Sequence, residues 1–161
     1  MITKGQKIPS VTIKQATPDG VSDVDPAALF AGKKVVMFTL PGAFTPTCSQ
    51  KHLPGYVAKL PELKAAGVDL VACLSVNDGF VMKAWAEQHD ALGKITMLAD
   101  GTAAFSKALG IDNDFTAYGM GIRAGRGVIT IDNGVVTSID MEAPGKFEVS
   151  SAEACLIGLK K

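Results

Sequence analysis

An apolar run over residues 35–40 is the feature that most restricts the fold of this chain. Because the run is nearly continuous rather than alternating, it predicts a strand buried on both faces, as in a parallel sheet covered by helices. Pro41 and Gly42 end the strand, and apolar residues spaced three or four apart then predict a helix to about residue 64. The segment is therefore a strand–turn–helix unit of an α/β protein, and Cys48 lies in the first turn of its helix.

The rest of the chain alternates between strand and helix patterns. Strands are predicted at residues 11–14, 68–76, 95–98, 128–131 and 135–139, and helices at 25–30, 79–88, 103–109 and 151–159. Residues 111–125 are predicted to be a loop, and Asn133-Gly134 predicts a tight hairpin turn. Pro54 predicts a distortion of the helix near residues 50–51. This order describes the thioredoxin architecture with extra elements: an α/β fold with a central mixed sheet flanked by helices, formed by one domain over residues 1–161.

Charge and targeting patterns disfavour several function classes. Sixteen basic and sixteen acidic residues give a formal net charge of zero, which favours neither nucleic acid nor an anionic membrane as a partner. Residues 1–7 contain no apolar core of a secretory signal, and no run is long and apolar enough to span a bilayer. The three cysteines have neither zinc-type spacing nor a CxxC pair, which is typical of a cytoplasmic thiol protein rather than a disulfide framework.

Cys48 is the candidate nucleophile. Free N–H groups and the positive end of the dipole at a helix N-terminus stabilise thiolates, and thiols in such places ionise at a pH of about 3.5–7.5 instead of about 8.5. Thr45 is predicted at or near the N-cap, and Pro46 suits the first helical turn. The alternative is a buried structural cysteine, the commoner role of a free thiol. The strand-to-helix context favours the reactive thiol.

The string PGAFTPTCSQKHLPGY resembles the active-site segment of the peroxiredoxins, and most closely that of type II, the peroxiredoxin-5 type. The resemblance continues over residues 71–81 and 126–134 and covers nearly the whole chain, so a peroxiredoxin N-terminal extension and insertion are expected on the thioredoxin-like fold. The positions that match the active-site motif are Pro41, Thr45, Cys48, Ser49, His52, Leu53, Pro54, Gly55 and Tyr56.

The resemblance implies a thiol-dependent peroxidase that reduces hydrogen peroxide and alkyl hydroperoxides by oxidation of Cys48 to a sulfenic acid. Thr45 would position the peroxide, and Pro41 would shape and shield the pocket. An arginine must stabilise the charge that spreads over the O–O bond. The family places it at Arg126, whereas Arg123, the only other arginine, is expected to contact solvent or a partner. No metal or organic cofactor is implied.

His52 lies four residues after Cys48 and therefore on the same helix face. One interpretation is the nucleophile–base pair of a cysteine hydrolase. A pair on one helix leaves little room for a substrate between its side chains, so a structural or orienting role for His52 is preferred. His89, near the end of another predicted helix, is expected to be solvated.

The return of oxidised Cys48 to the thiol has two routes. Cys73, in a predicted buried strand, is either a core residue or the resolving thiol, and a direct disulfide would need Cα atoms within about 7 Å or local unfolding. Cys155 lies in the last predicted helix, and the preceding segment 145–151, where some relatives carry a resolving cysteine, has none. The resemblance therefore favours a one-cysteine cycle with glutathione and glutaredoxin, or thioredoxin, as the electron donor.

The family also implies a homodimer, to which Phe44, Phe80 and the segment around Gly79 are expected to contribute. Two rival functions remain. The first is a thiol–disulfide oxidoreductase of thioredoxin fold, which the missing CxxC disfavours. The second is a redox sensor or holdase whose oxidised Cys48 reports to a partner.

Overall fold

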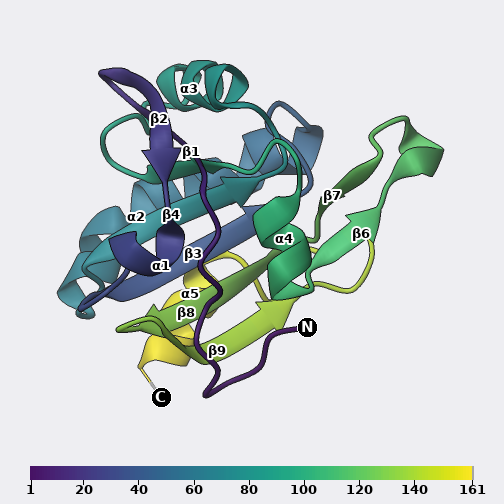
Figure 1. Ribbon diagram of the computed structural model, residues 1–161. Coiled ribbons are helices and arrows are strands. Elements are labelled where there is room, and N and C mark those ends of the chain that lie inside the picture. Colours follow the sequence, from purple (N-terminus) through teal and green to yellow (C-terminus); the bar gives the residue numbers. More distant parts are fainter. Residues whose placement is uncertain (161) are drawn as a thin grey trace.

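The computed structural model describes residues 1–160 of the chain. Within these residues, seven strands form one mixed sheet in the order β2-β1-β5-β4-β3-β8-β9 (Figure 1). The predicted α/β alternation around a central mixed sheet is therefore confirmed. The strands are β1 (Ile13–Thr17), β2 (Gly20–Val24), β3 (Lys34–Leu40), β4 (Leu70–Ser75), β5 (Thr96–Ala99), β8 (Gly127–Asp132) and β9 (Val135–Met141).

The strand predicted to be buried on both faces is β3. It pairs in parallel with β4 and antiparallel with β8, so its main chain is bonded on both sides. Two hairpins extend the sheet in opposite directions, β1–β2 beside β5 and β8–β9 beside β3. The predicted Asn-Gly turn joins β8 to β9, and both residues have the positive φ that such a turn needs, 49° at Asn133 and 79° at Gly134.

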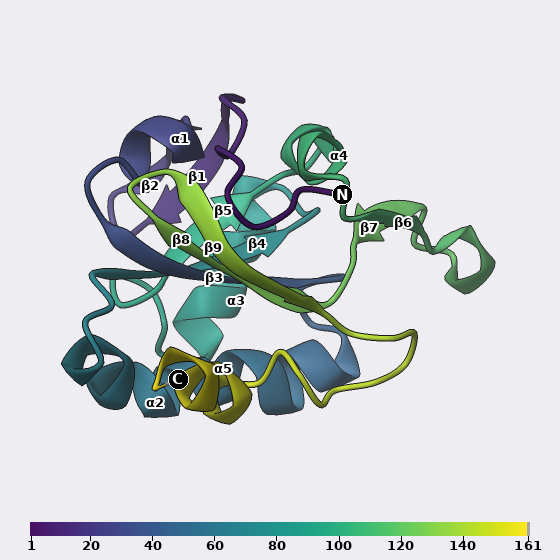
Figure 2. The same ribbon diagram turned by 90° about the horizontal axis from the view of Figure 1, so that it is seen from below.

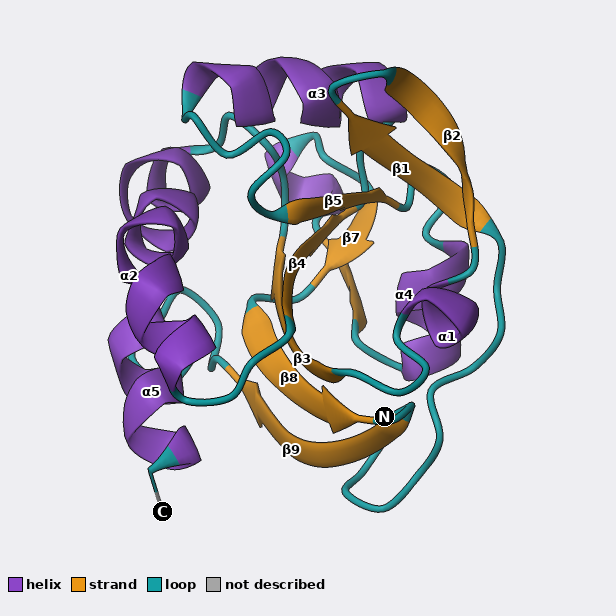
Figure 3. Cartoon of the chain, turned by 90° about the vertical axis from the view of Figure 1, so that its left-hand side faces the viewer, coloured by secondary structure: helices purple, strands orange, loops and turns teal. Residues whose placement is uncertain are grey.

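Helices cover both faces of the sheet, as Figures 2 and 3 show. Buried side chains of α2, α3 and α5 form one apolar cluster with the sheet, and this cluster includes all three cysteines of the chain. A second cluster lies under α1 and α4. None of the helices in the described part of the chain is long and apolar enough to cross a bilayer. The helices are α1 (Pro26–Leu29), α2 (Leu53–Ala65), α3 (Gly79–Gln88), α4 (Ala104–Leu109) and α5 (Ala152–Leu159).

The prediction of a loop over residues 111–125 was wrong. The segment forms a second, two-stranded sheet of β6 (Asp112–Asp114) and β7 (Ile122–Ala124), joined by a 3-10 turn over Thr116–Tyr118. This hairpin projects from the body of the molecule (Figures 1 and 2). Its strands are only three residues long, shorter than the roughly four to eight residues over which alternation identifies a strand, so the usual strand signal is absent.

Candidate active site

Cys48 lies at the start of a helix, as predicted. Pro46 and Thr47 are the first helical residues, and a π turn, η1 (Cys48–His52), then leads into α2. The N–H of Leu53 donates to the carbonyl of Cys48, which closes this wide turn. Pro54 has no N–H to offer, which accounts for the distortion that was predicted here. The Cys48 side chain is fully buried.

The guanidinium of Arg126 contacts the sulfur of this cysteine. Nη2 of Arg126 donates to Cys48 Sγ at 3.0 Å, and Nη1 of the same side chain lies 2.9 Å from Nδ1 of His52. Two nitrogens of one planar fork are thus held by two different partners, an arrangement that the single ammonium group of a lysine does not offer. A positive charge at hydrogen-bond distance from a sulfur favours the ionised form.

The main chain around Arg126 is fixed to strands on both sides. The buried hydroxyl of Thr39 in β3 donates to the carbonyl of Gly125 at 2.7 Å. On the other side, a Cβ at Gly127 would lie 2.2 Å from Sδ of Met141 in β9, so this position has no room for a side chain unless Met141 moves. These contacts hold the start of β8 where the guanidinium reaches the helix that carries Cys48.

His52 is fully buried and neutral. Its Nε2 lies 3.0 Å from the carbonyl of Ser150, which can only accept, so the ring proton is on Nε2 and Nδ1 accepts from Arg126. Burial first, and then the positive charge of Arg126, lower the pKa of His52 from 6.5 to about 3, although the hydrogen bond to Ser150 opposes them. Because Nδ1 bonds to Arg126 rather than to the sulfur, the arrangement is not a Cys–His nucleophile–base pair and suits the orienting role.

The loop between β3 and the Cys48 helix is held by side chains from elsewhere in the chain. The N–H of Ala43 donates to Oδ1 of Asn77 at 2.9 Å. Thr45 stands directly before the first helical residue, as predicted, and its carbonyl accepts the N–H of Ser49 at 2.9 Å. Its hydroxyl donates to the carbonyl of Gly42 at 2.7 Å. Phe44 has a φ of 67°, a left-handed conformation that costs a residue other than glycine about 1–2 kcal/mol.

Arg123 makes contacts that were not predicted, while its side chain stays partly exposed. Its guanidinium is turned toward the active-site loop: Nε donates to the carbonyl of Met120 at 2.9 Å and Nη1 to the carbonyl of Pro41 at 3.1 Å. A Cβ at Gly42 would lie 2.8 Å from this Nη1, so the approach depends on glycine there. Arg123 thereby connects the β6–β7 hairpin to Pro41, the first residue of this loop.

The other two cysteines are buried free thiols. Cys73 lies in β4, and burial raises its pKa well above the usual value, with the nearby charge of Cys48 raising it further and Arg126 opposing. Cys155 lies in α5, where burial raises its pKa to about 11. His89 is half-buried rather than solvated, with its ring edge against Trp85.

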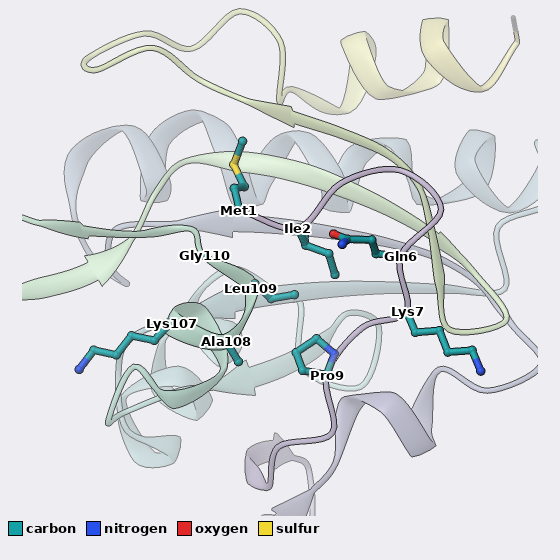
Figure 4. Close-up of a pocket in the computed structure, with 9 residues that line it drawn as sticks. All are labelled: Met1, Ile2, Gln6, Lys7, Pro9, Lys107, Ala108, Leu109 and Gly110. Atoms are coloured by element: carbon teal, nitrogen blue, oxygen red, sulfur yellow. The ribbon is translucent and has the colours of Figure 1, made fainter.

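One surface hollow lies away from these residues. It has a volume of about 630 Å³ and is lined by the N-terminal segment and the end of α4, including Lys7 and Lys107 (Figure 4). No cysteine or carboxylate lines it. The reactive side chains that the sequence singled out therefore lie at the buried Cys48–Arg126 contact and not in this hollow.

Sequence reasoning did not identify three residues that hold this site together: Asn77, Glu142 and Ser150. Asn77 follows the end of β4, and a polar residue at the carboxyl end of a parallel strand is a usable signal for a site. Glu142 follows β9, and its carboxylate binds the main chain of residues 148–150. No spacing rule predicts that contact, because it depends on the path of an irregular loop.

Known proteins match this chain in sequence and in structure over nearly its whole length. The Redoxin family model matches residues 3–156. Peroxiredoxin-2C of Arabidopsis thaliana is 43% identical over 159 residues, which are 98% of each protein. Two solved structures cover 99% of both chains: reduced Prx3 of Vibrio vulnificus in complex with hydrogen peroxide, with 53% identity and a TM-score of 0.94, and peroxiredoxin 5 of Alvinella pompejana, with 32% identity and a TM-score of 0.87.

The Redoxin match and the peroxiredoxin relatives place this thioredoxin-like fold, with its buried cysteine at a helix start, in the class of thiol peroxidases. Within that class, the chain belongs to the type II peroxiredoxins, which include the peroxiredoxin-2 and peroxiredoxin-5 types. The fold class and the family indicated by the active-site string are both confirmed. The protein is an enzyme that reduces peroxide with a thiol.

Proposed function

We propose that Cys48 is the nucleophile of this peroxidase, with Arg126, Thr45 and Pro41 as its partners. The Cys48 thiolate attacks the terminal oxygen of a hydroperoxide, the S–O bond forms as the O–O bond breaks, and the alkoxide or hydroxide that leaves takes up a proton. Cys48 is left as a sulfenic acid. The observation that carries this proposal is the 3.0 Å contact from Nη2 of Arg126 to the buried Sγ of Cys48.

Arg126 stabilises the charge that spreads from the sulfur over the breaking O–O bond. Its guanidinium keeps its charge at any working pH, and the contact from Nη1 to His52 sets the direction of Nη2. A donor fixed in advance costs little reorganisation when the charge develops. Arg126 therefore acts on both the thiolate and the transition state.

Thr45 and Pro41 shape the place of the peroxide. The proton of the Thr45 hydroxyl is donated to the carbonyl of Gly42, which leaves the lone pairs of Oγ1 to accept the O–H of a bound hydroperoxide. The carbonyl of Pro41 is held by Arg123, which fixes the position of Pro41 at the start of the loop. Together they orient the O–O bond toward the sulfur and limit access of water.

Substitution of Cys48 tests the assignment. Peroxide consumption is measured with dithiothreitol as the reductant, which needs no protein donor. Cys48→Ser is expected to abolish turnover, whereas Cys155→Ser, a matched loss of one thiol, retains it. Retention of most of the activity in Cys48→Ser would show that another residue is the nucleophile.

We propose hydrogen peroxide and alkyl hydroperoxides as the substrates. The neighbour from Vibrio vulnificus is described as a complex with hydrogen peroxide, and it is 53% identical to this chain. Competition between hydrogen peroxide and tert-butyl hydroperoxide for the reduced protein measures the preference. A protein that reacts with neither would contradict the proposal.

For the reductive half-reaction, we propose a one-cysteine cycle in which an external thiol, from glutathione with glutaredoxin or from thioredoxin, attacks the Cys48 sulfenic acid. Cys73 is the candidate internal resolving thiol, but it is buried and its raised pKa keeps it protonated, so it would act only after local unfolding. Cys73→Ser is expected to keep full turnover with each donor. Loss of thioredoxin-linked turnover in that variant would establish Cys73 as the resolving residue.

We propose that residues 1–161 act as one domain that forms a homodimer in a reducing compartment such as the cytoplasm. The two phenylalanines expected at the interface are exposed, Phe44 at 49% and Phe80 at 75%. All three cysteines are free, which suits a reducing compartment. Sedimentation of wild type and Phe80→Ser tests the dimer, since a monomeric wild type would contradict it.

A further inference from the structure

The carboxylate of Glu142 binds an unusual number of donors from one short stretch of chain. It accepts the main-chain N–H groups of Glu148, Val149 and Ser150 at 2.8–2.9 Å and the Ser150 hydroxyl at 2.6 Å. Partial burial raises the pKa of Glu142, but these hydrogen bonds outweigh it and hold the pKa below its usual value. Glu142 is therefore an ionised clamp on the loop that leads into α5.

The same residue is fixed to the active-site strand. The N–H of Glu142 donates to the carbonyl of Arg126 at 2.8 Å, directly beyond the pairing of Gly127 with Met141. The main chain of Glu142 is thus hydrogen-bonded to the main chain of Arg126, while the side chain of Glu142 holds residues 148–150. The position of the loop is set relative to Arg126 and not only relative to α5.

The clamped loop returns to the active site at Ser150. The carbonyl of Ser150 accepts from Nε2 of His52 at 3.0 Å and from the hydroxyl of Tyr56 at 2.8 Å. The first of these bonds selects the tautomer in which Nδ1 of His52 accepts from Nη1 of Arg126. The other arm of that guanidinium points at Cys48 Sγ.

A second contact comes from the same loop. The ring of Phe147 packs edge-on against His52, with ring centroids 5.0 Å apart, and Cζ of Arg126 lies 6.0 Å from the centroid of that ring. Displacement of the loop would therefore remove the Ser150 carbonyl from His52, and the Phe147 ring from both His52 and Arg126.

We propose that Glu142 is a positioning residue of the peroxidase: its carboxylate fixes Ser150, Ser150 fixes His52, and His52 aims Arg126 at the sulfur of Cys48. The inference rests on the proposed roles of Cys48 and Arg126 and extends them to a residue that touches neither the sulfur nor the peroxide. The alternative is a purely structural role, in which Glu142 only secures the start of α5.

Glu142→Gln separates the two roles, and Glu148→Gln is its matched control. The control makes the same chemical change in the same loop, at an exposed side chain. Two quantities are measured: the second-order rate constant for peroxide and the pH profile for alkylation of Cys48. A structural role lowers the melting temperature without moving the pH midpoint of alkylation.

We expect the peroxide rate constant of Glu142→Gln to fall about tenfold, less than the roughly hundredfold loss that a 1 Å misplacement causes. The alkylation midpoint is expected to move to higher pH, because a loosened Arg126 stabilises the thiolate less. Glu148→Gln is expected to stay within about twofold of wild type. An unchanged Glu142→Gln, or equal losses in both variants, would overturn the inference.

Two further variants keep the test decisive. If Glu142→Gln does not fold, Ser150→Ala removes only the hydroxyl bond to the carboxylate, and a smaller loss of rate supports the inference while no loss overturns it. Arg126→Lys separates the proposed role of Arg126 from the positioning role of Glu142. If Arg126→Lys is impaired and Glu142→Gln is not, the inference fails alone, whereas an unimpaired Arg126→Lys removes the proposed role of Arg126 and the inference with it.

Discussion

Replacement of His52 by glutamine should make the free energy of unfolding less sensitive to acid. His52 is fully buried, and burial together with the charge of Arg126 lowers its pKa from 6.5 to about 3. Glutamine can donate an N–H to the Ser150 carbonyl and accept from Arg126, but it does not titrate. The substitution therefore removes the titration and retains both types of contact.

The magnitude follows from the two pKa values. Between pH 6.5 and about pH 3, the unfolded chain binds a proton at His52 and the folded chain does not, so acid favours unfolding over this window. Each pH unit in the window costs about 1.4 kcal/mol. A change from neutral pH to about pH 5 therefore removes about 2 kcal/mol of stability that depends on His52, and the loss ends near pH 3, where folded His52 also takes up a proton.

Urea unfolding of reduced wild type and His52→Gln, at one protein concentration and at both pH values, measures the difference. Carboxylates with lowered pKa values, such as Glu142 and Asp114, also lose stabilisation in acid, but they titrate in both proteins and cancel in the comparison. Wild type should lose about 2 kcal/mol more than the variant. Equal losses in the two proteins would refute a buried, neutral His52.

Three further predictions concern the contacts around the sulfur. Arg126→Lys should lower the peroxide rate constant about a hundredfold with little change in the urea midpoint, because an ammonium group lacks the rigid fork that places one nitrogen at His52 and the other at Cys48. Stopped-flow kinetics and urea unfolding check this. Arg123→Lys and Gly42→Ala should cause similar, smaller losses of rate in the same kinetic assay, since each disturbs the hydrogen bond from Arg123 to the Pro41 carbonyl. A loss in Arg123→Lys as large as that in Arg126→Lys would reverse the ranking of the two arginines. At about pH 8, brief alkylation of the folded protein should leave Cys73 and Cys155 unmodified, because burial raises the pKa of both thiols. Peptide mass mapping identifies the modified cysteine, and reaction of Cys73 or Cys155 before Cys48 would contradict the prediction.

The parts of the fold that depend on local pattern were predictable. The apolar run before Pro41 identified the central strand, because only a strand covered on both faces is apolar at nearly every position. Helix α3 has the predicted bounds, since Asp78 accepts the N–H groups of Phe80 and Val81 as a standard N-cap. The start of the helix at Pro46, ahead of Cys48, was predictable for a different reason, because proline suits the first helical turn, where its missing N–H has no helical partner.

The contacts that aim side chains were not predictable. Arg123 has a long, flexible side chain, and its turn toward Pro41 rather than solvent depends on where the β6–β7 hairpin lies. Glu142 reaches an irregular loop, where neither a helical nor a strand period applies. His52 was placed on the correct helix face, but its partner Ser150 is 98 residues away in the sequence, and only the folded chain brings them together.

The identity of the nucleophile is tested most directly by the mass of the reduced protein after one equivalent of hydrogen peroxide, followed by rapid blocking of thiols and peptide mapping. With Cys48 as the nucleophile, the peptide that contains Cys48 gains one oxygen. Loss of two hydrogens with a bond from Cys48 to Cys73 would still place the attack at Cys48, but would replace the one-cysteine cycle with an internal one. Oxidation at Cys73 or Cys155 with Cys48 unchanged would contradict the account.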